Sequence, residues 1–183
     1  MKPSRRWSVI VFLTFTTFGY SQVDSTPHKV QFVTVDNGVN REILDWGGSG
    51  RPLILLPGLG DTAHVFDKFA LKLTSNCHVF GITPRGFGAS SALPPLPANY
   101  SADRLGKDVV TVIESLKLER PILAGHSVAG EILSAVRAHY PKSVSALIYI
   151  DAGYPFALYD EVHGDLVLDA IALRNELDRL DLV

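Results

Sequence analysis

The chain has 183 residues, of which 46% are hydrophobic and 20% are charged, with a formal net charge of −2. This composition fits one globular domain and excludes a largely disordered chain, and the absence of a basic excess speaks against nucleic-acid binding. The single cysteine, Cys77, excludes an internal disulfide and any multi-cysteine metal site, and its apolar neighbours predict inert packing.

The first 21 residues predict a signal peptide. Residues 2–6 give a basic start, residues 7–18 are apolar without a charge, and residues 19–21 offer the small side chains that a signal peptidase reads. The apolar run is too short for a bilayer-spanning anchor. We therefore expect cleavage after Ser21 and an exported protein, periplasmic or secreted, without a stable membrane anchor. An uncleaved N-terminal anchor or a buried helix is the alternative.

Strands and helices are predicted to alternate over the rest of the chain. Two β-rich stretches, 30–35 and 43–46, flank the turn signal Asn37-Gly38 and predict an antiparallel hairpin. Short apolar runs predict four further strands, at 53–56, 79–82, 122–124 and 146–150. Apolar residues at helical spacing predict helices within 66–73, 105–116 and 132–140. Such alternation is typical of a mostly parallel sheet with helices on both faces, a three-layer α/β fold.

The pattern changes from about Asp160 onward. One apolar stripe at helical spacing runs through Leu166, Ala170, Leu173, Leu177 and Leu180. We interpret residues 1–21 as the signal peptide, 22–157 as a partial α/β core and 158–183 as the start of a helical lid.

The segment Gly125-His126-Ser127-Val128-Ala129-Gly130 lies directly between a predicted strand and a predicted helix. A serine at such a junction is held on a sharp, strained turn, with its hydroxyl projecting from the sheet at a helix N-terminus. Small residues must flank it because strand and helix nearly collide. Ser127 is therefore a candidate nucleophile, and an ordinary serine N-cap is the alternative.

A glycine-rich loop, Pro57-Gly58-Leu59-Gly60-Asp61, follows the first predicted buried strand. Such a loop can aim a backbone N–H at the space above the serine. The amides of Leu59 and Val128 would together form an oxyanion hole for a tetrahedral intermediate.

The same loop also fits a dinucleotide fingerprint, because residues 58–63 read G-x-G-x-x-A between a strand and a helix. A site for NAD needs an acidic residue about 20 positions later, and none occurs between Leu73 and Pro97. Arg85 could instead meet the extra phosphate of NADP. An NADP-binding oxidoreductase therefore stays open as an alternative function.

Three segments together resemble the α/β-hydrolase superfamily, in its lid-bearing, esterase-like branch. Residues 54–60 look like the oxyanion-loop strand, residues 83–90 like the Arg-Gly-x-Gly loop, and residues 124–127 like the nucleophile elbow. The resemblance implies a serine hydrolase that acts on a small-molecule ester or related acyl bond without a cofactor. Two departures are Ala129 at a usual glycine and Pro57 where many members carry histidine.

The resemblance also bears on the other polar residues near the predicted site. Asp151 ends a predicted strand at the catalytic edge and is a candidate for the acid of the catalytic triad, because a minority of the superfamily places the acid there. In the alternative interpretation, Asp151 hydrogen-bonds backbone amides in the turn before Gly153. His126 is adjacent to Ser127, and because neighbouring side chains diverge on such a turn we expect a structural role. His64 and His163 are expected to be solvated or packing residues, and Arg85 a cation that organises its loop.

A serine needs a base, which in the resembled family is a histidine on a loop after the last strand. Beyond Ser127 the sequence contains only His139 and His163. His139 lies about 18 Å along the helix from Ser127, at 1.5 Å per residue. We therefore expect the C-terminal strands, most of the lid and the catalytic histidine to be missing from the chain. On this expectation the chain is not a competent esterase, and a non-catalytic binding module is a further alternative.

Overall fold

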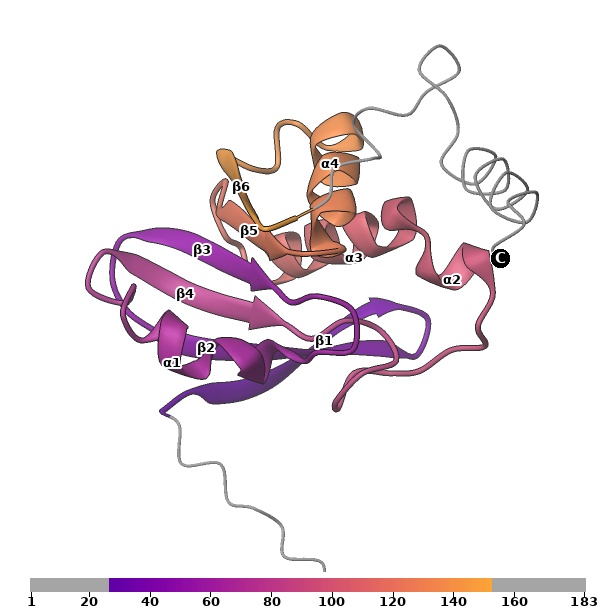
Figure 1. Cartoon of the computed structure of the whole chain (residues 1–183), viewed down its shortest axis with the longest axis horizontal. Helices are drawn as coiled ribbons and strands as arrows, with labels where there is room; N and C mark the ends of the chain where they lie inside the picture. Colours follow the sequence, from indigo (N-terminus) through magenta and orange to yellow (C-terminus); the bar gives the residue numbers. More distant parts are fainter. Residues whose placement is uncertain (1–26, 153–183) are drawn as a thin grey trace, which may run out of the picture.

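A computed structural model of the protein describes residues 27–152 (Figure 1). The predicted signal peptide, the predicted lid and His163 lie outside the described residues. None of the helices within residues 27–152 has the length and apolar character to cross a bilayer.

Within residues 27–152, six strands form one sheet, in the order β1-β2-β4-β3-β5-β6. The strands are β1 (Lys29–Asp36), β2 (Val39–Gly47), β3 (Arg51–Leu56), β4 (Cys77–Ile82), β5 (Ile122–His126) and β6 (Ala146–Ile150). β2 runs antiparallel to both β1 and β4, whereas β4, β3, β5 and β6 are parallel to one another. The mostly parallel sheet with an N-terminal antiparallel hairpin confirms the predicted fold class.

Helical segments cover both faces of this sheet. They are η1 (Ala63–Phe66), α1 (Asp67–Ala70), α2 (Pro97–Tyr100), α3 (Ala102–Ser115) and α4 (Ala129–His139). Successive residues of β3 alternate between two cores: Ile54 and Leu56 pack with α3 and α4, while Leu53 and Leu55 pack with η1 and α1. All four side chains are buried, because this central strand is covered on both sides.

Two helical segments differ from the sequence prediction. The helix expected within 66–73 is α-helical only at Asp67–Ala70 and directly follows the 3₁₀ turn Ala63–Phe66, with Phe66 at φ −92° and ψ 0° between the two. The segment between β4 and α3, for which the sequence pattern predicts no helix, contains the short helix α2, which starts with Pro97 at a position where the missing N–H costs nothing. Ser101 caps the N-terminus of α3, since its side chain accepts a hydrogen bond from the Arg104 amide.

A buried cluster of charges joins α3 to the sheet. Asp108, in α3, accepts hydrogen bonds from Arg85 (2.5 and 2.7 Å) and from Arg41 Nη1 (2.8 Å). Arg41 also donates to the Thr83 carbonyl, at 2.9 Å. All three charged side chains are buried. Burial lowers the pKa of Arg41 to about 10, against the opposing effect of Asp108, so the guanidinium stays charged at neutral pH.

Replacing Asp108 by asparagine should therefore be strongly destabilising. Asp108→Asn keeps the side-chain shape but leaves two buried guanidinium groups without their carboxylate, which should cost about 3–5 kcal/mol of unfolding free energy. Asp103→Asn is the matched control, because Asp103 is on the same helix but more than half exposed, where its pair with His139 contributes little. Urea unfolding measures both variants, and equal losses would contradict this account of the cluster.

Candidate active site

Ser127 occupies a strained turn between β5 and α4. Its φ of +54° lies in the left-handed region, which is uncommon for a residue other than glycine. The Ser127 amide donates to the Ile150 carbonyl of β6 (3.4 Å), and the Ser127 carbonyl accepts from the Gly130 amide (3.0 Å). These bonds fix the turn at the carboxyl edge of the parallel strands, as the sequence predicted.

The small residues around Ser127 are required by close packing. A β-carbon at Gly125 would lie 3.1 Å from each of three atoms: Ala129 Cβ, the Ala129 carbonyl oxygen and Leu133 Cδ1. Ala129 is itself fully buried. β5 and α4 therefore approach each other too closely for larger side chains at these two positions, and alanine at 129 is tolerated where glycine is usual.

The glycine-rich loop contacts this turn directly. A β-carbon at Gly58 would lie 3.2 Å from Ser127 Cβ and 3.0 Å from His126 Nδ1. The His126 ring thus packs over Gly58, and among residues 27–152 it makes no hydrogen bond with Ser127. This arrangement agrees with the structural role expected for His126, and it shows why glycine is needed at position 58.

The two candidate oxyanion donors border one cavity. In the part of the chain that the structure describes, neither the Leu59 amide nor the Val128 amide donates a hydrogen bond to the protein. Both side chains are exposed, Leu59 by 77% and Val128 by 39%. Both residues also line a pocket of about 140 Å³. Two N–H groups beside a small pocket next to a serine suit the binding of a carbonyl oxygen.

The pocket is mostly apolar and lies between the glycine-rich loop, the loop after β4, and the starts of α3 and α4. Its lining is Pro57, Gly58, Leu59, Pro84, Arg85, Phe87, Tyr100, Ala102, Leu105, Val128, Glu131 and Ile132. Glu131 was not singled out from the sequence, although its position four residues after Ser127 places it one helical turn further along α4.

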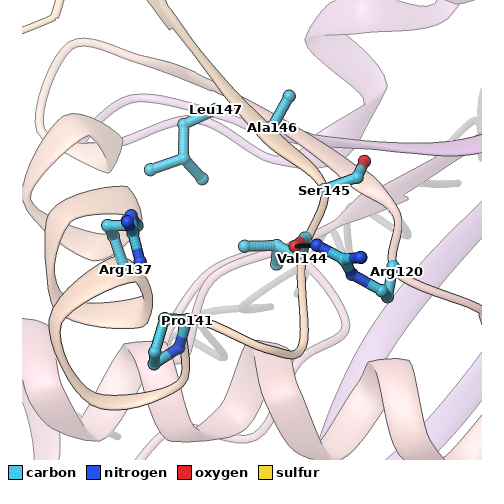
Figure 2. Close-up of a pocket in the computed structure, with 7 residues that line it drawn as sticks. All are labelled: Arg120, Arg137, Pro141, Val144, Ser145, Ala146 and Leu147. Carbon is cyan, nitrogen blue, oxygen red and sulfur yellow. Dashed lines mark hydrogen bonds between the residues drawn. The ribbon is translucent and has the colours of Figure 1, made fainter.

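A larger cavity, of about 390 Å³, lies at the opposite end of the sheet. Figure 2 shows it between α4 and the start of β6, with Arg137 and Arg120 on its two sides. Arg120 donates to the Val144 carbonyl there, at 3.3 Å. Because this cavity adjoins the amino ends of the strands, it is remote from Ser127, and open α/β sheets place their ligands at the other edge.

Asp151 follows β6 at the same edge as Ser127. The register pairs His126 with Ile150, so Ser127 and Asp151 are the next residues on two neighbouring strands. Asp151 is exposed and has a φ of +42°. Within residues 27–152 its carboxylate has no hydrogen-bond partner, and Gly153 lies outside the described residues. The predicted choice between triad acid and turn residue therefore stays a prediction.

Two histidines of the described residues that could be considered as the base are paired with carboxylates. His139, near the far end of α4, is half-exposed and lies 3.0 Å from Asp103 of α3. His64 faces Asp67 and Glu42 instead of the serine. The expectation that neither His139 nor His64 serves as the base agrees with these positions.

The structure contradicts the proposed NADP contact of Arg85. Its side chain is buried and bonded to Asp108, so the guanidinium is not presented to a phosphate. The glycine-rich loop also leads into a four-residue 3₁₀ helix, whereas a pyrophosphate site uses the N-terminus of a longer helix. Arg85 is the loop-organising cation that the sequence suggested.

A family profile described as the alpha/beta hydrolase fold matches residues 51–174. The chain belongs to this family. It is 33% identical to a candidate carbamate hydrolase of Caulobacter segnis over 120 residues, which are 64% of this chain and 44% of that relative. It is 31% identical to a fluoroacetate dehalogenase of a Burkholderia species over 118 residues, which are 63% of this chain and 39% of that relative.

Among solved structures, the N-formylmaleamic acid deformylase of Pseudomonas putida S16 is 29% identical, with a TM-score of 0.59, over 68% of this chain and 47% of that one. The chain thus spans about two fifths of the length of the curated relatives that it matches. Their names include a carbamate hydrolase, a haloperoxidase, a dehalogenase and a deformylase, so family membership does not identify a substrate.

The strain at Ser127 predicts an unusual stability order. Ser127→Gly should be about 1 kcal/mol more stable than Ser127→Ala, because glycine adopts positive φ without a β-carbon clash. At Lys107, an exposed position inside α3, the order should reverse, with glycine about 1 kcal/mol less stable than alanine. Urea unfolding of the four variants measures both differences. If the alanine variant were the more stable one at both positions, Ser127 would not be strained.

Proposed function

We propose that the protein is a serine hydrolase of esterase type, in which Ser127 attacks the carbonyl of a small-molecule ester or related acyl compound. The observation that carries this proposal is the left-handed turn at Ser127, held against Gly58 at the carboxyl edge of the sheet. A strained serine at this position has a chemical use that an ordinary helix cap does not require.

In the proposed reaction, Ser127 Oγ forms a bond to the carbonyl carbon while its proton passes to a histidine base. The carbonyl oxygen becomes an oxyanion and accepts hydrogen bonds from the Leu59 and Val128 amides. The C–O bond to the leaving group then breaks, the leaving group takes the proton, and water later hydrolyses the acyl-enzyme. A single oxyanion donor contributes about 10²–10³ in rate. We assign the base to none of the histidines of residues 27–152 and propose Asp151 as its carboxylate partner.

The pocket beside the two amides supports a short, uncharged acyl group. Its volume of about 140 Å³ is small, and its lining is apolar apart from Arg85, whose charge is neutralised by Asp108, and Glu131. The Glu131 carboxylate would repel an anionic acyl group. A non-catalytic binding module remains the second candidate, since the same pocket could hold a ligand without turnover, and covalent labelling separates the two.

The nucleophile assignment is tested with a fluorophosphonate probe, on a form of the protein that hydrolyses a short p-nitrophenyl ester. Ser127→Ala should abolish labelling and lower turnover to the background rate, because the attacking oxygen is lost. Ser115→Ala is the matched control: Ser115 is exposed at the end of α3, and its loss should leave labelling unchanged. Full labelling of Ser127→Ala would disprove the assignment.

We also propose that the protein is exported, with residues 1–21 removed. The basic, apolar and small-residue layout of this segment supports the proposal. N-terminal sequencing of protein recovered from outside the cytoplasm should begin at Gln22. Recovered protein that still carried the residues before Ser21 would contradict the cleavage, and protein found only in the cytoplasm would contradict export.

A further inference from the structure

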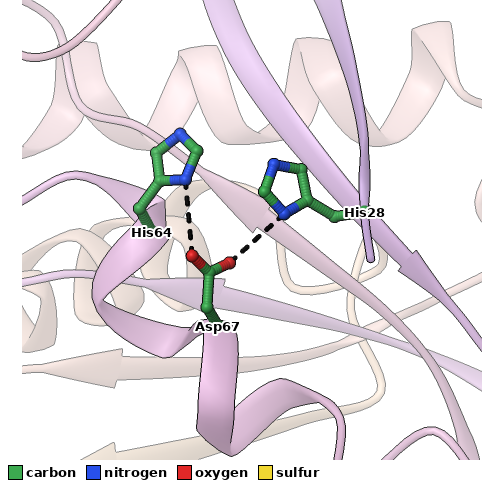
Figure 3. Close-up of side chains that lie close together, drawn as sticks. All are labelled: His28, His64 and Asp67. Atoms are coloured by element: carbon green, nitrogen blue, oxygen red, sulfur yellow. Dashed lines mark ion pairs between the residues drawn. The ribbon is translucent and has the colours of Figure 1, made fainter. Parts of the chain in front are cut away.

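Two histidines and an aspartate converge on the face of the sheet covered by η1 and α1. His28 immediately precedes β1, His64 lies in η1, and Asp67 begins α1 (Figure 3). One ligand atom from each residue lies within 4.8 Å of the other two. We propose that these three side chains form a binding site for a divalent transition-metal ion, with Zn²⁺ the best match.

The distances fit tetrahedral coordination. His28 Nδ1 lies 3.4 Å from Asp67 Oδ1, and His64 Nδ1 lies 3.5 Å from Asp67 Oδ2. Ligands bound at 2.0–2.1 Å to a tetrahedral zinc are about 3.4 Å apart, and each histidine nitrogen lies at about this distance from one of the two Asp67 oxygens. One Asp67 oxygen would serve as the ligand to both sides, and the ligand atoms, which lie within 4.8 Å of one another, would draw together around the ion. The His64 side chain is 35% exposed and is the least buried of the three, so we expect it to move most. A water molecule would fill the fourth position.

The neighbours of these residues can orient the ligands. Glu42 Oε1 lies 3.8 Å from His64 Nε2, the ring nitrogen that points away from Asp67. The Trp46 indole N–H donates to Asp67 Oδ1 at 2.9 Å. A carboxylate behind a histidine and a hydrogen bond to the liganding carboxylate are the outer contacts that zinc sites use. Asp67 and Glu42 together also supply two negative charges to balance a divalent cation.

The donor atoms favour zinc over calcium and magnesium. Two imidazole nitrogens and one carboxylate suit borderline transition metals, whereas Ca²⁺ and Mg²⁺ prefer oxygen ligands. The bound ion would join the segment before β1 to the turn between η1 and α1. It would therefore anchor the first strand to the helical layer and stabilise the fold, independently of the proposed hydrolysis at Ser127.

The test is calorimetric titration of Zn²⁺ into the full chain, carrying no histidine tag and treated beforehand with a chelator. Wild type should bind one equivalent and show a raised Tm. His28→Gln and His64→Gln should each weaken binding by more than about 100-fold. The matched control is His78→Gln. The His78 side chain is similarly exposed (38%), and its Nε2 lies 2.8 Å from Asp45 Oδ1. His78 is not part of the group formed by His28, His64 and Asp67, so its loss should leave zinc binding unchanged.

Each outcome decides the proposal. The proposal is supported if wild type and His78→Gln each bind one equivalent of zinc and His64→Gln binds none. Circular dichroism of His64→Gln, a change at a partly exposed residue, then excludes misfolding as the cause of the loss. No zinc binding by wild type, or equal affinity in wild type and both ligand variants, overturns it and leaves Asp67 as an ion-pair partner of the histidines. Equal loss in His78→Gln indicates non-specific surface binding and also overturns it.

Discussion

The ion pairs of Asp108 keep the parts of the candidate site in register. This single buried carboxylate is bonded to Arg41 of β2 and to Arg85 of the loop after β4. The start of α3 and the loop containing Arg85 form two walls of the pocket next to Ser127. The pocket walls are therefore held together by paired charges as well as by apolar packing, and a buried charge pair tolerates the loss of a partner poorly.

The candidate site also depends on a close approach between backbone segments at the carboxyl edge of the sheet. A β-carbon at Gly58 or Gly125 would lie only 3.0–3.1 Å from neighbouring atoms, and Ser127 lies two residues after Gly125 and against Gly58. The left-handed conformation of Ser127 persists because β5, α4 and the β6 carbonyl all constrain its turn. The backbone geometry on which the proposed nucleophilic attack depends is thus a product of the surrounding packing.

The sequence predicts those parts of the fold that depend on local pattern. Apolar runs locate the strands, and the small residues around Ser127 indicate the strained turn, because both signals are short-range. The role of Asp108 could not be predicted in this way, since its partners come from β2 and a distant loop. The same holds for His28, which meets His64 and Asp67 only after β1 is placed beside β2. Contacts between distant segments leave no local pattern in a single sequence.

The position of β3 in the centre of the sheet has a consequence for the order of folding. β1 and β2 pair as a local hairpin. β3 must instead pair with β4 on one side and with β5 on the other, and β5 follows β3 in the chain only after β4 and α3. Pairings between such distant segments form late, because the intervening chain must first be ordered. Ser127 leaves β5 and depends on β6 as well, so its strained conformation can be reached only after most of the sheet has assembled. If Ser127 is the nucleophile that we propose, the serine of an incompletely folded chain is therefore unreactive, and its reactivity appears only as folding is completed.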